Sequence, residues 1–462
     1  MAAQDMEKTE LFESMPIPRA VMKLSIPTVL SSLVMVIYNL ADTYFVGMLN
    51  DPIQNAAVTL AAPMLLAFNA VNNLFGVGSS SMMSRALGHK DMDTAYKSSA
   101  FGFYCSLGCA LLFSLLVTIF LNPLLGVLGA GADTMDATAG YMKWTVCCGA
   151  APAILNVVMA YMVRAEGASL HASVGTMSGC ILNMILDPIF ILPWGLDMGA
   201  EGAGLATFLS NCVACGYFFV LLYIKRGKTV VCINPRKLRF EKKIVAGICG
   251  VGVPASIQNL LNVTGMTILN NFTAAFGADA VAAMGIAQKI SNIPMQIALG
   301  MSQGIMPLIG YNYASGNVKR MKKTLTFTVK IALSFLIAMA VVCYVGAGPL
   351  IGLFMDNDVI IAYGSRFLRG FCLSMPFLSI DFISVGVYQS CGLGWYSLIF
   401  AVMRKIVLEI PLLFVLNHFF PLYGLPYAQP ITEFILAIAA VVVLVRLFKR
   451  LETNGYGKAK EA

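Results

Sequence analysis

The stretch KRGKTVVCINPRKLRFEKK, residues 225–243, is the longest hydrophilic segment of the 462-residue chain and falls near its middle. It holds eight basic residues and has long apolar runs on both sides. Such a segment is typical of a linker between two membrane-embedded halves, because basic residues gather on the cytoplasmic side of a membrane. It predicts an N-terminal lobe over residues 24–224 and a C-terminal lobe over residues 244–447.

The composition excludes a soluble globule. Apolar residues make up 58% of the chain and charged residues 12%, whereas soluble proteins average about 25% charged residues. This much apolar surface requires the bilayer as its solvent. The formal net charge of +8 comes from short clusters between apolar runs, which favours a membrane surface over nucleic acid as the partner.

Apolar runs along the chain predict twelve transmembrane helices, because an isolated segment in lipid must satisfy its own backbone hydrogen bonds. Transmembrane strands would be about 10 residues long with alternating hydrophobicity, and that pattern is missing from the sequence. The fold class is therefore all-α integral membrane, in two pseudo-symmetric six-helix bundles. The predicted spans are 24–46, 58–84, 98–121, 139–163, 172–192, 204–224, 244–272, 282–308, 324–348, 361–389, 396–416 and 427–447.

The charges of the loops predict the orientation. The loops alternate between two sets, one with 24 of the 31 basic residues and the other with no Lys or Arg and eight acids. Basic loops are cytoplasmic, so the segment 1–23 and the tail 448–462 are both expected in the cytoplasm. Because each lobe has an even number of spans, both lobes begin on the same side of the membrane. This favours a transporter whose two repeats are related by an axis along the membrane normal.

Five acidic residues lie inside the predicted spans: Asp42, Asp187, Asp381, Glu409 and Glu433. An ionised carboxylate at mid-bilayer costs about 2.5–3.5 kcal/mol on insertion scales, so each needs a structural or functional reason.

A polar cluster is predicted in the N-terminal lobe. Asn183 and Asp187 are four residues apart and share one helical face. Asp42 and Thr207 are expected at similar depth, with Asn156 somewhat deeper. Two carboxylates with amides and a hydroxyl suit a proton or sodium site. In the alternative interpretation, Asp42 caps a helix end and Asp187-Pro188 marks a kink.

The C-terminal lobe has a less clear pattern. Glu409 follows Lys405 by four residues, which favours an internal ion pair. Lys289 is an unusual intramembrane cation that either pairs with Asp381 or lines a polar cavity. Gln258 lies in the predicted span 244–272.

Several motifs make the sequence resemble the multidrug and toxic compound extrusion (MATE) family over about residues 15–447. The motifs are Met15-Pro16-Ile17-Pro18, Leu24-Ser25-Ile26-Pro27, Tyr38–Gly47, Ala86-Leu87-Gly88, Asn183–Phe190, Ala282-Ala283, Gly285-Ile286-Ala287 and Gly310-Tyr311-Asn312-Tyr313.

The resemblance implies an antiporter of bacteria or archaea that exports bulky, often cationic drugs or toxins in exchange for H⁺ or Na⁺. It implies a monomer in the plasma membrane, without cofactor and without a metal other than Na⁺ at Asp42 and Asp187.

The positions that match the family's branch with an ion site in the N-terminal lobe are Asp42, Asn156, Asn183, Asp187 and Thr207. A second branch uses a Glu in the seventh span and an Asp in the tenth. Asp381 is a candidate for that Asp, but the seventh span here contains no acid, which favours coupling in the N-terminal lobe.

The substrate cavity is assigned to five polar residues of the spans. They are Tyr38, Gln258, Lys289, Asp381 and Glu409.

Two alternatives remain open. A lipid-linked oligosaccharide flippase of the wider superfamily would need a strongly cationic cavity, whereas embedded cations are few. A membrane-embedded transferase would need a clustered acidic or His/Cys motif at the membrane face. The nearest acidic pair, Asp356 and Asp358, falls in a predicted outer loop.

Overall fold

A computed structural model describes residues 10–49, 51–355 and 357–458, and all the regular elements in these ranges are helices. The all-helical class predicted from the apolar runs is thereby confirmed. The chain divides into two compact units. Unit 1 comprises Met1–Ser14 and Leu30–Ser256, and unit 2 comprises Met15–Val29 and Ile257–Ala462.

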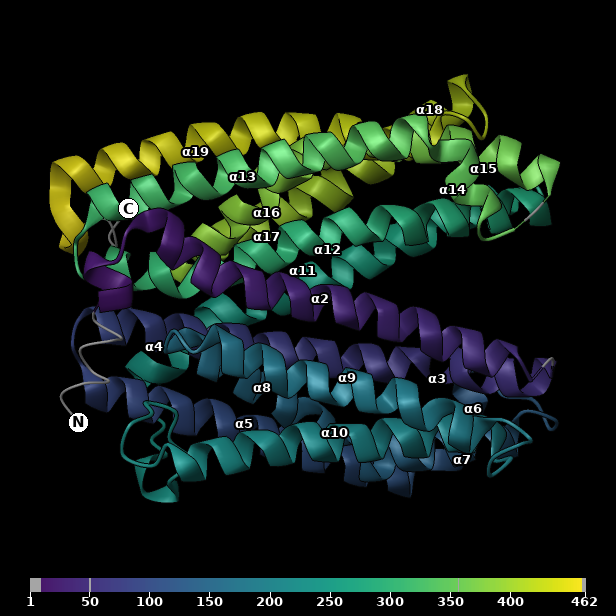
Figure 1. The fold of residues 1–462 in the computed structure, drawn as a ribbon, viewed down its shortest axis with the longest axis horizontal. Coiled ribbons are helices and arrows are strands. Elements are labelled where there is room, and N and C mark those ends of the chain that lie inside the picture. The colour runs from purple at the N-terminus through teal and green to yellow at the C-terminus, as the bar shows by residue number, and fades with distance from the viewer. Residues whose placement is uncertain (1–9, 50, 356, 459–462) are drawn as a thin grey trace. The chain divides into compact units, whose positions relative to one another are not determined.

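Unit 1 contains the linker and most of the first half of the chain, and its long helices run roughly along one common direction (Figure 1). A helix that belongs to both units, α2 (Ile17–Gly47), enters it at Leu30. The other elements of unit 1 are η1 (Glu10–Ser14), α3 (Pro52–Val71), η2 (Asn72–Val77), α4 (Gly78–Gly88), α5 (Met92–Ile119), α6 (Leu121–Val127), α7 (Met135–Met142), η3 (Lys143–Cys148), α8 (Ala150–Ala165), α9 (Ser169–Ile191), α10 (Gly199–Ile224) and η4 (Pro235–Lys237).

Unit 2 contains the second half of the chain from Ile257 onward. The helix α11 (Lys242–Ala274) enters it from unit 1. The other elements of unit 2 are α12 (Ala278–Ala314), α13 (Val318–Val345), α14 (Ala347–Gly352), α15 (Asp358–Cys372), α16 (Met375–Ser390), α17 (Gly394–Val402), η5 (Met403–Glu409), α18 (Ile410–Phe419), η6 (Leu425–Tyr427) and α19 (Ala428–Lys458). The lobe boundaries expected at residues 224 and 244 stay a prediction.

Length and composition support fewer spans than the twelve expected. Eight helices in the described residues are long and apolar enough to cross a membrane, or ten if the bent pairs α7/η3 with α8 (50°) and α15 with α16 (48°) each count as one. The other two expected spans are helical but more polar. One is α12, which carries several Gln, Asn and Ser residues, and the other is α17–η5–α18, which contains Arg404, Lys405 and Glu409.

Helices α9 and α10 pack closely because small residues line the face of α9 that meets α10. A Cβ atom on Gly179 would lie 3.0 Å from Cβ of Ala214 and 3.2 Å from the carbonyl oxygen of Ser210, both on α10. Gly175 lies one turn before Gly179 and faces Phe218 of α10. Small residues at this spacing let two membrane helices approach closely. The next two positions at intervals of four residues along α9 are Asn183 and Asp187.

The core of unit 2 forms where α12 packs against α15 and α16. Its apolar side chains come mainly from these three helices, which lie side by side in unit 2 (Figure 1). Ala283, Ala287 and Phe367 are fully buried within it. This packing places α16, which carries Asp381, inside unit 2.

Candidate functional site

The polar cluster of unit 1 is built on the face of α9 that meets α10. Asn183 and Asp187 are both buried, and they continue the stripe of Gly175 and Gly179. Because α9 and α10 approach closely along this stripe, Asn183 contacts Thr207 of α10 directly. The helical spacing used to predict the pair is therefore realised in the structure.

Asn183 connects Asp187 to Thr207 on α10. Amide orientation is assigned from the surrounding hydrogen bonds, and one orientation satisfies every neighbour. In it, Asn183 Nδ2 donates to Asp187 Oδ2 at 2.7 Å and to Oδ1 at 3.1 Å. Its Oδ1 accepts from Thr207 Oγ1 at 3.2 Å and from the Thr207 backbone N–H at 3.1 Å. Asn183, Asp187 and Thr207 thus form one hydrogen-bonded group, as expected from the sequence.

Asp42 on α2 belongs to the same region of unit 1. Its charge interacts electrostatically with that of Asp187, and both carboxylates interact with the hydroxyl groups of Tyr38 and Tyr141. Tyr38 lies one turn before Asp42 on α2, and Tyr141 comes from α7. The two carboxylates are therefore close enough for the charge of one to affect the other. No ion pair with Lys or Arg is formed by either of them among the described residues.

Asn156 is linked to α10 rather than to the carboxylates. Its Nδ2 lies 3.0 Å from Oδ1 of Asn211 and also donates to the carbonyl oxygens of Pro152 at 2.8 Å and Ala153 at 3.2 Å. Sequence reasoning missed Asn211, although a usable signal existed. Asn211 follows Thr207 by four residues, so the two lie on one face of α10.

A second group of buried charges lies in unit 2. Arg404 of η5 contacts the carboxylate of Asp381 on α16, and its Nε lies 3.2 Å from Oε1 of Glu433 on α19. Arg404 Nη2 also donates to Glu433 Oε2 at 3.2 Å. All three side chains are buried. The sequence drew attention to the two acids but did not identify Arg404 as their partner, because the three residues come from three different helical segments.

The predicted pair of Lys405 and Glu409 is present. Lys405 Nζ lies 2.6 Å from Glu409 Oε2 and 2.8 Å from Oε1 within η5. Asp381 is paired with Arg404, so the suggested pairing of Asp381 with Lys289 is wrong. Lys289 lies exposed on α12. Gln258 on α11 accepts a hydrogen bond from Gln389 at 3.4 Å.

The assignment of Tyr38, Gln258, Lys289, Asp381 and Glu409 to a substrate cavity stays a prediction. Asp381 and Glu409 are buried in ion pairs within unit 2. Within the described parts of the chain, no group of three or more His, Cys, Asp and Glu side chains is placed to hold a metal ion.

The profile of the MatE family matches residues 27–189 and 254–415, one region in each half of the sequence. The multidrug export protein MepA of Staphylococcus aureus (strain MRSA252) is 32% identical over 450 residues, which cover 97% of this chain and 98% of MepA. The chain belongs to the MatE family. The MepA of Staphylococcus haemolyticus (strain JCSC1435) is similar to this MatE protein too, with 33% identity over 451 residues and the same coverage.

Solved structures agree with membership of the MatE family. One, described as the outward-facing conformation of a multidrug resistance MATE family transporter of the MOP superfamily, has a TM-score of 0.91. It is 26% identical and covers 97% of this chain and 99% of its own. A MATE structure described as being in the bent conformation has a TM-score of 0.88 at 26% identity, with the same coverage. The chain is therefore a membrane transporter of this family rather than an enzyme.

Proposed function

We propose that this MatE protein is a secondary active exporter that expels amphiphilic, often cationic drugs or toxins in exchange for H⁺ or Na⁺. The relatives named multidrug export protein and multidrug resistance transporter support the drug substrates. The pair of Asp42 and Asp187 supports the ion coupling, because it places two interacting carboxylates among neutral partners.

The negative charge of Asp187, which forms no ion pair among the described residues, is the main support for the proposal. Asp187 is fully buried and its described partners are the amide of Asn183 and, through it, the hydroxyl of Thr207. Burying a carboxylate is costly unless it is neutralised or paired. A proton or Na⁺ at Asp187 and Asp42 would supply that neutralisation. This supports membership of the branch of the family that couples ions in the N-terminal lobe.

Unit 2 offers a weaker site for coupling. Arg404 and Lys405 already compensate two of the three buried carboxylates Asp381, Glu409 and Glu433. An incoming ion would therefore gain less there than at the acids of unit 1. This supports coupling in the N-terminal half of the chain.

Transport follows from alternating access. An ion drives the cycle only if its affinity differs between the two access states, since equal affinity would leave their populations unchanged. Ion binding at Asp42 and Asp187 removes charge from the ends of α2 and α9. The neutral cluster then favours a packing of these helices in which drug binds less tightly, and the drug leaves on the outer side.

The placement in the cell is part of the proposal. The similarity to MepA supports a plasma-membrane protein of a bacterium or archaeon. The alternation of basic and acidic loops supports both termini in the cytoplasm. Each half of the sequence contains one complete match to the family profile. This supports a monomer as the transporting species.

Dye efflux from proteoliposomes tests the proposal. We expect Asp42→Asn and Asp187→Asn each to lower the efflux of an ethidium-like cation by at least about tenfold, because the neutral amide cannot exchange an ion. Asp133→Asn changes an exposed carboxylate of the loop between α6 and α7 and serves as the matched control. Wild-type efflux in both Asp42→Asn and Asp187→Asn would contradict the proposed coupling site.

Separate gradients identify the ion. Efflux by the wild type is measured with a pH gradient alone and with a Na⁺ gradient alone. We expect only the gradient of the coupling ion to drive efflux. Efflux that needs neither gradient would contradict antiport itself.

A further inference from the structure

The linker of residues 225–243 is bound along unit 1. Buried Glu166, at the end of α8, accepts hydrogen bonds from Thr229 Oγ1 at 3.0 Å and from the Val230 backbone N–H at 2.8 Å. The Cys232 backbone N–H donates to Ser99 Oγ at 2.9 Å, and Tyr104 Oη donates to the Ile233 carbonyl oxygen at 2.6 Å. The surface that the linker presents is therefore held in a fixed shape.

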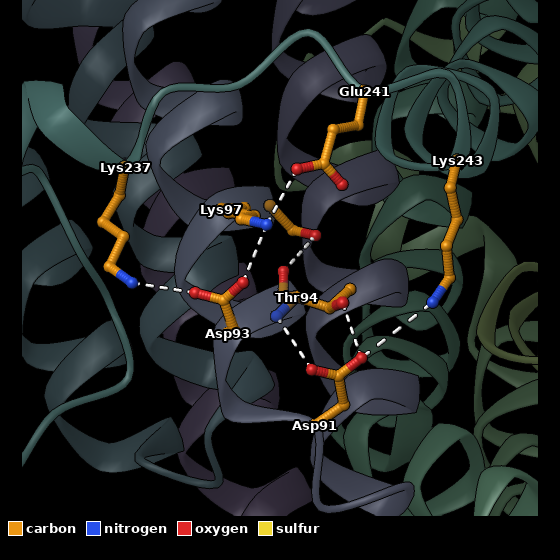
Figure 2. A network of polar contacts seen from close by, with 8 residues as sticks. Asp91, Asp93, Thr94, Lys97, Lys237, Glu241 and Lys243 are labelled. Atoms are coloured by element: carbon orange, nitrogen blue, oxygen red, sulfur yellow. Dashed lines mark hydrogen bonds and ion pairs between the residues drawn. The ribbon is translucent and has the colours of Figure 1, made fainter.

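The acids around the linker are already occupied (Figure 2). Lys97 lies 2.7 Å from both Asp93 and Glu241, and Lys237 lies 2.8 Å from Asp93. Asp91 accepts from Thr94 and lies 3.9 Å from Lys243. These contacts use the carboxylates that would otherwise neutralise the remaining cations of the linker.

Four basic side chains of the linker remain available to a partner. Arg226, Arg236, Arg239 and Lys242 are exposed, and within the described residues none of them forms an ion pair. Glu241 is the single acid in the segment and is held by Lys97. The outer surface of the linker is thus strongly positive.

Large apolar side chains lie beside these cations. Phe240 is 70% exposed although its ring packs edge-to-face on Phe101 of α5, with ring centroids 5.5 Å apart. Tyr223 and Ile224, which precede the linker on α10, are 78% and 73% exposed. Aromatic side chains next to Arg and Lys are typical of the boundary between lipid headgroups and acyl chains.

The linker contacts α5 over about two helical turns. Asp93, which pairs with Lys237, and Phe101, which packs on Phe240, are eight residues apart on α5, or roughly 12 Å along the helix. The linker therefore contacts both the charged first turn of α5 and Phe101 further along the helix. Arg239 immediately precedes Phe240, and both side chains are exposed.

We propose that the outer surface of the linker, formed by Arg226, Arg236, Arg239, Lys242 and Phe240, binds an anionic phospholipid of the phosphatidylglycerol type. The arginines and Lys242 bind the phosphate, and guanidinium groups suit this because they donate two parallel hydrogen bonds. An acyl chain lies against Phe240. The proposal does not depend on the transported substrate.

Lipid titration tests this surface. The full chain in detergent is titrated with phosphatidylglycerol or phosphatidylcholine, and the midpoint of thermal unfolding is measured. We expect phosphatidylglycerol alone to raise the midpoint. The variant R226Q/R236Q/R239Q/K242Q should need about tenfold more phosphatidylglycerol for half the effect, since each basic residue near an anionic surface contributes to binding.

A matched variant controls for total charge. K319Q/K323Q/K449Q/R450Q removes four exposed basic residues of unit 2 and should respond to phosphatidylglycerol as the wild type does. An equal loss of response in this control would overturn the proposal, because net charge rather than the linker would then explain the binding. If R226Q/R236Q/R239Q/K242Q fails to fold, the single variants R239Q and F240S are titrated instead. A wild-type response to phosphatidylglycerol in both single variants would overturn the proposal.

Soluble anions separate a lipid from other partners. Glycerol phosphate has the same anionic group without acyl chains, and a DNA oligonucleotide is a polyanion of another class. We expect neither to reproduce the shift, and F240S to weaken the response to phosphatidylglycerol. A shift of equal size with either soluble anion would overturn the lipid assignment.

Discussion

The amide nitrogen of Asn183 lies 2.7 Å from Oδ2 of Asp187, one turn further along α9. The same amide accepts from Thr207 on the neighbouring helix α10. Asn183 therefore fixes the position of a buried carboxylate by tying it to a second helix. A hydrogen bond donated to a charged acceptor is stronger than one between neutral groups.

Loss of the Asn183 amide is expected to affect both stability and transport. Asn183→Ala leaves Asp187 without this donor in a buried site, which costs about 1–3 kcal/mol. We expect a lower midpoint of thermal unfolding in detergent and slower dye efflux in proteoliposomes. Asn271→Ala, at an exposed position of α11, should change neither. An Asn183→Ala protein with wild-type stability and efflux would show that the amide does not hold Asp187.

Asn211 is expected to be coupled to Asn156. Their side chains lie 3.0 Å apart between α8 and α10, and interhelical hydrogen bonds in membranes contribute about 0.6 kcal/mol on average, with a maximum near 1.7. A double-mutant cycle of Asn156→Ala and Asn211→Ala, followed by chemical unfolding in detergent micelles, should give a coupling energy in that range. Strict additivity of the two single changes would contradict the contact.

The sequence was most informative where a signal is local along one helix. The spacing of Asn183 and Asp187, and that of Lys405 and Glu409, predicted side chains that the structure brings together. Contacts that join distant segments left no such signal. Arg404 binds acids on α16 and α19, and no periodicity relates these three positions. The number of spans was also difficult to predict from the sequence, because α12 and the segment α17–η5–α18 are long enough to cross a membrane but contain polar or charged residues.

Arg404 should be indispensable only while its two acids are present. Arg404→Met leaves Asp381 and Glu433 as buried, uncompensated charges, and breaking a buried pair in this way costs about 3–5 kcal/mol. The triple variant R404M/D381N/E433Q removes all three charges and should recover most of the lost stability. Both proteins can be compared by thermal unfolding in the same detergent. A triple variant as unstable as Arg404→Met would show that packing, rather than charge balance, is the role of Arg404.

Asp91 provides a pH-dependent contact at the start of α5. The hydroxyl and the backbone N–H of Thr94 both donate to Asp91, at 2.6 and 3.1 Å, and hold the pKa of its carboxyl below the ordinary value of 3.8. A carboxyl whose pKa is lowered on folding stabilises the folded state above its unfolded pKa and loses this contribution as the pH falls through the folded value. The stabilisation should therefore be complete at pH 7 and decline below about pH 4.

Hydrogen exchange at the first turn of α5 measures this contact. We expect Asp91→Ala to increase exchange there at pH 7, since losing an N-cap costs about 0.5–2 kcal/mol. Thr94→Val removes the hydroxyl but keeps the backbone donor, so its effect should be smaller. The difference between wild type and Asp91→Ala should shrink as the pH is lowered below 4, because the wild-type carboxyl then becomes neutral. If that difference stays constant down to pH 2, the cap acts without its charge, which would contradict the pH dependence of this contact.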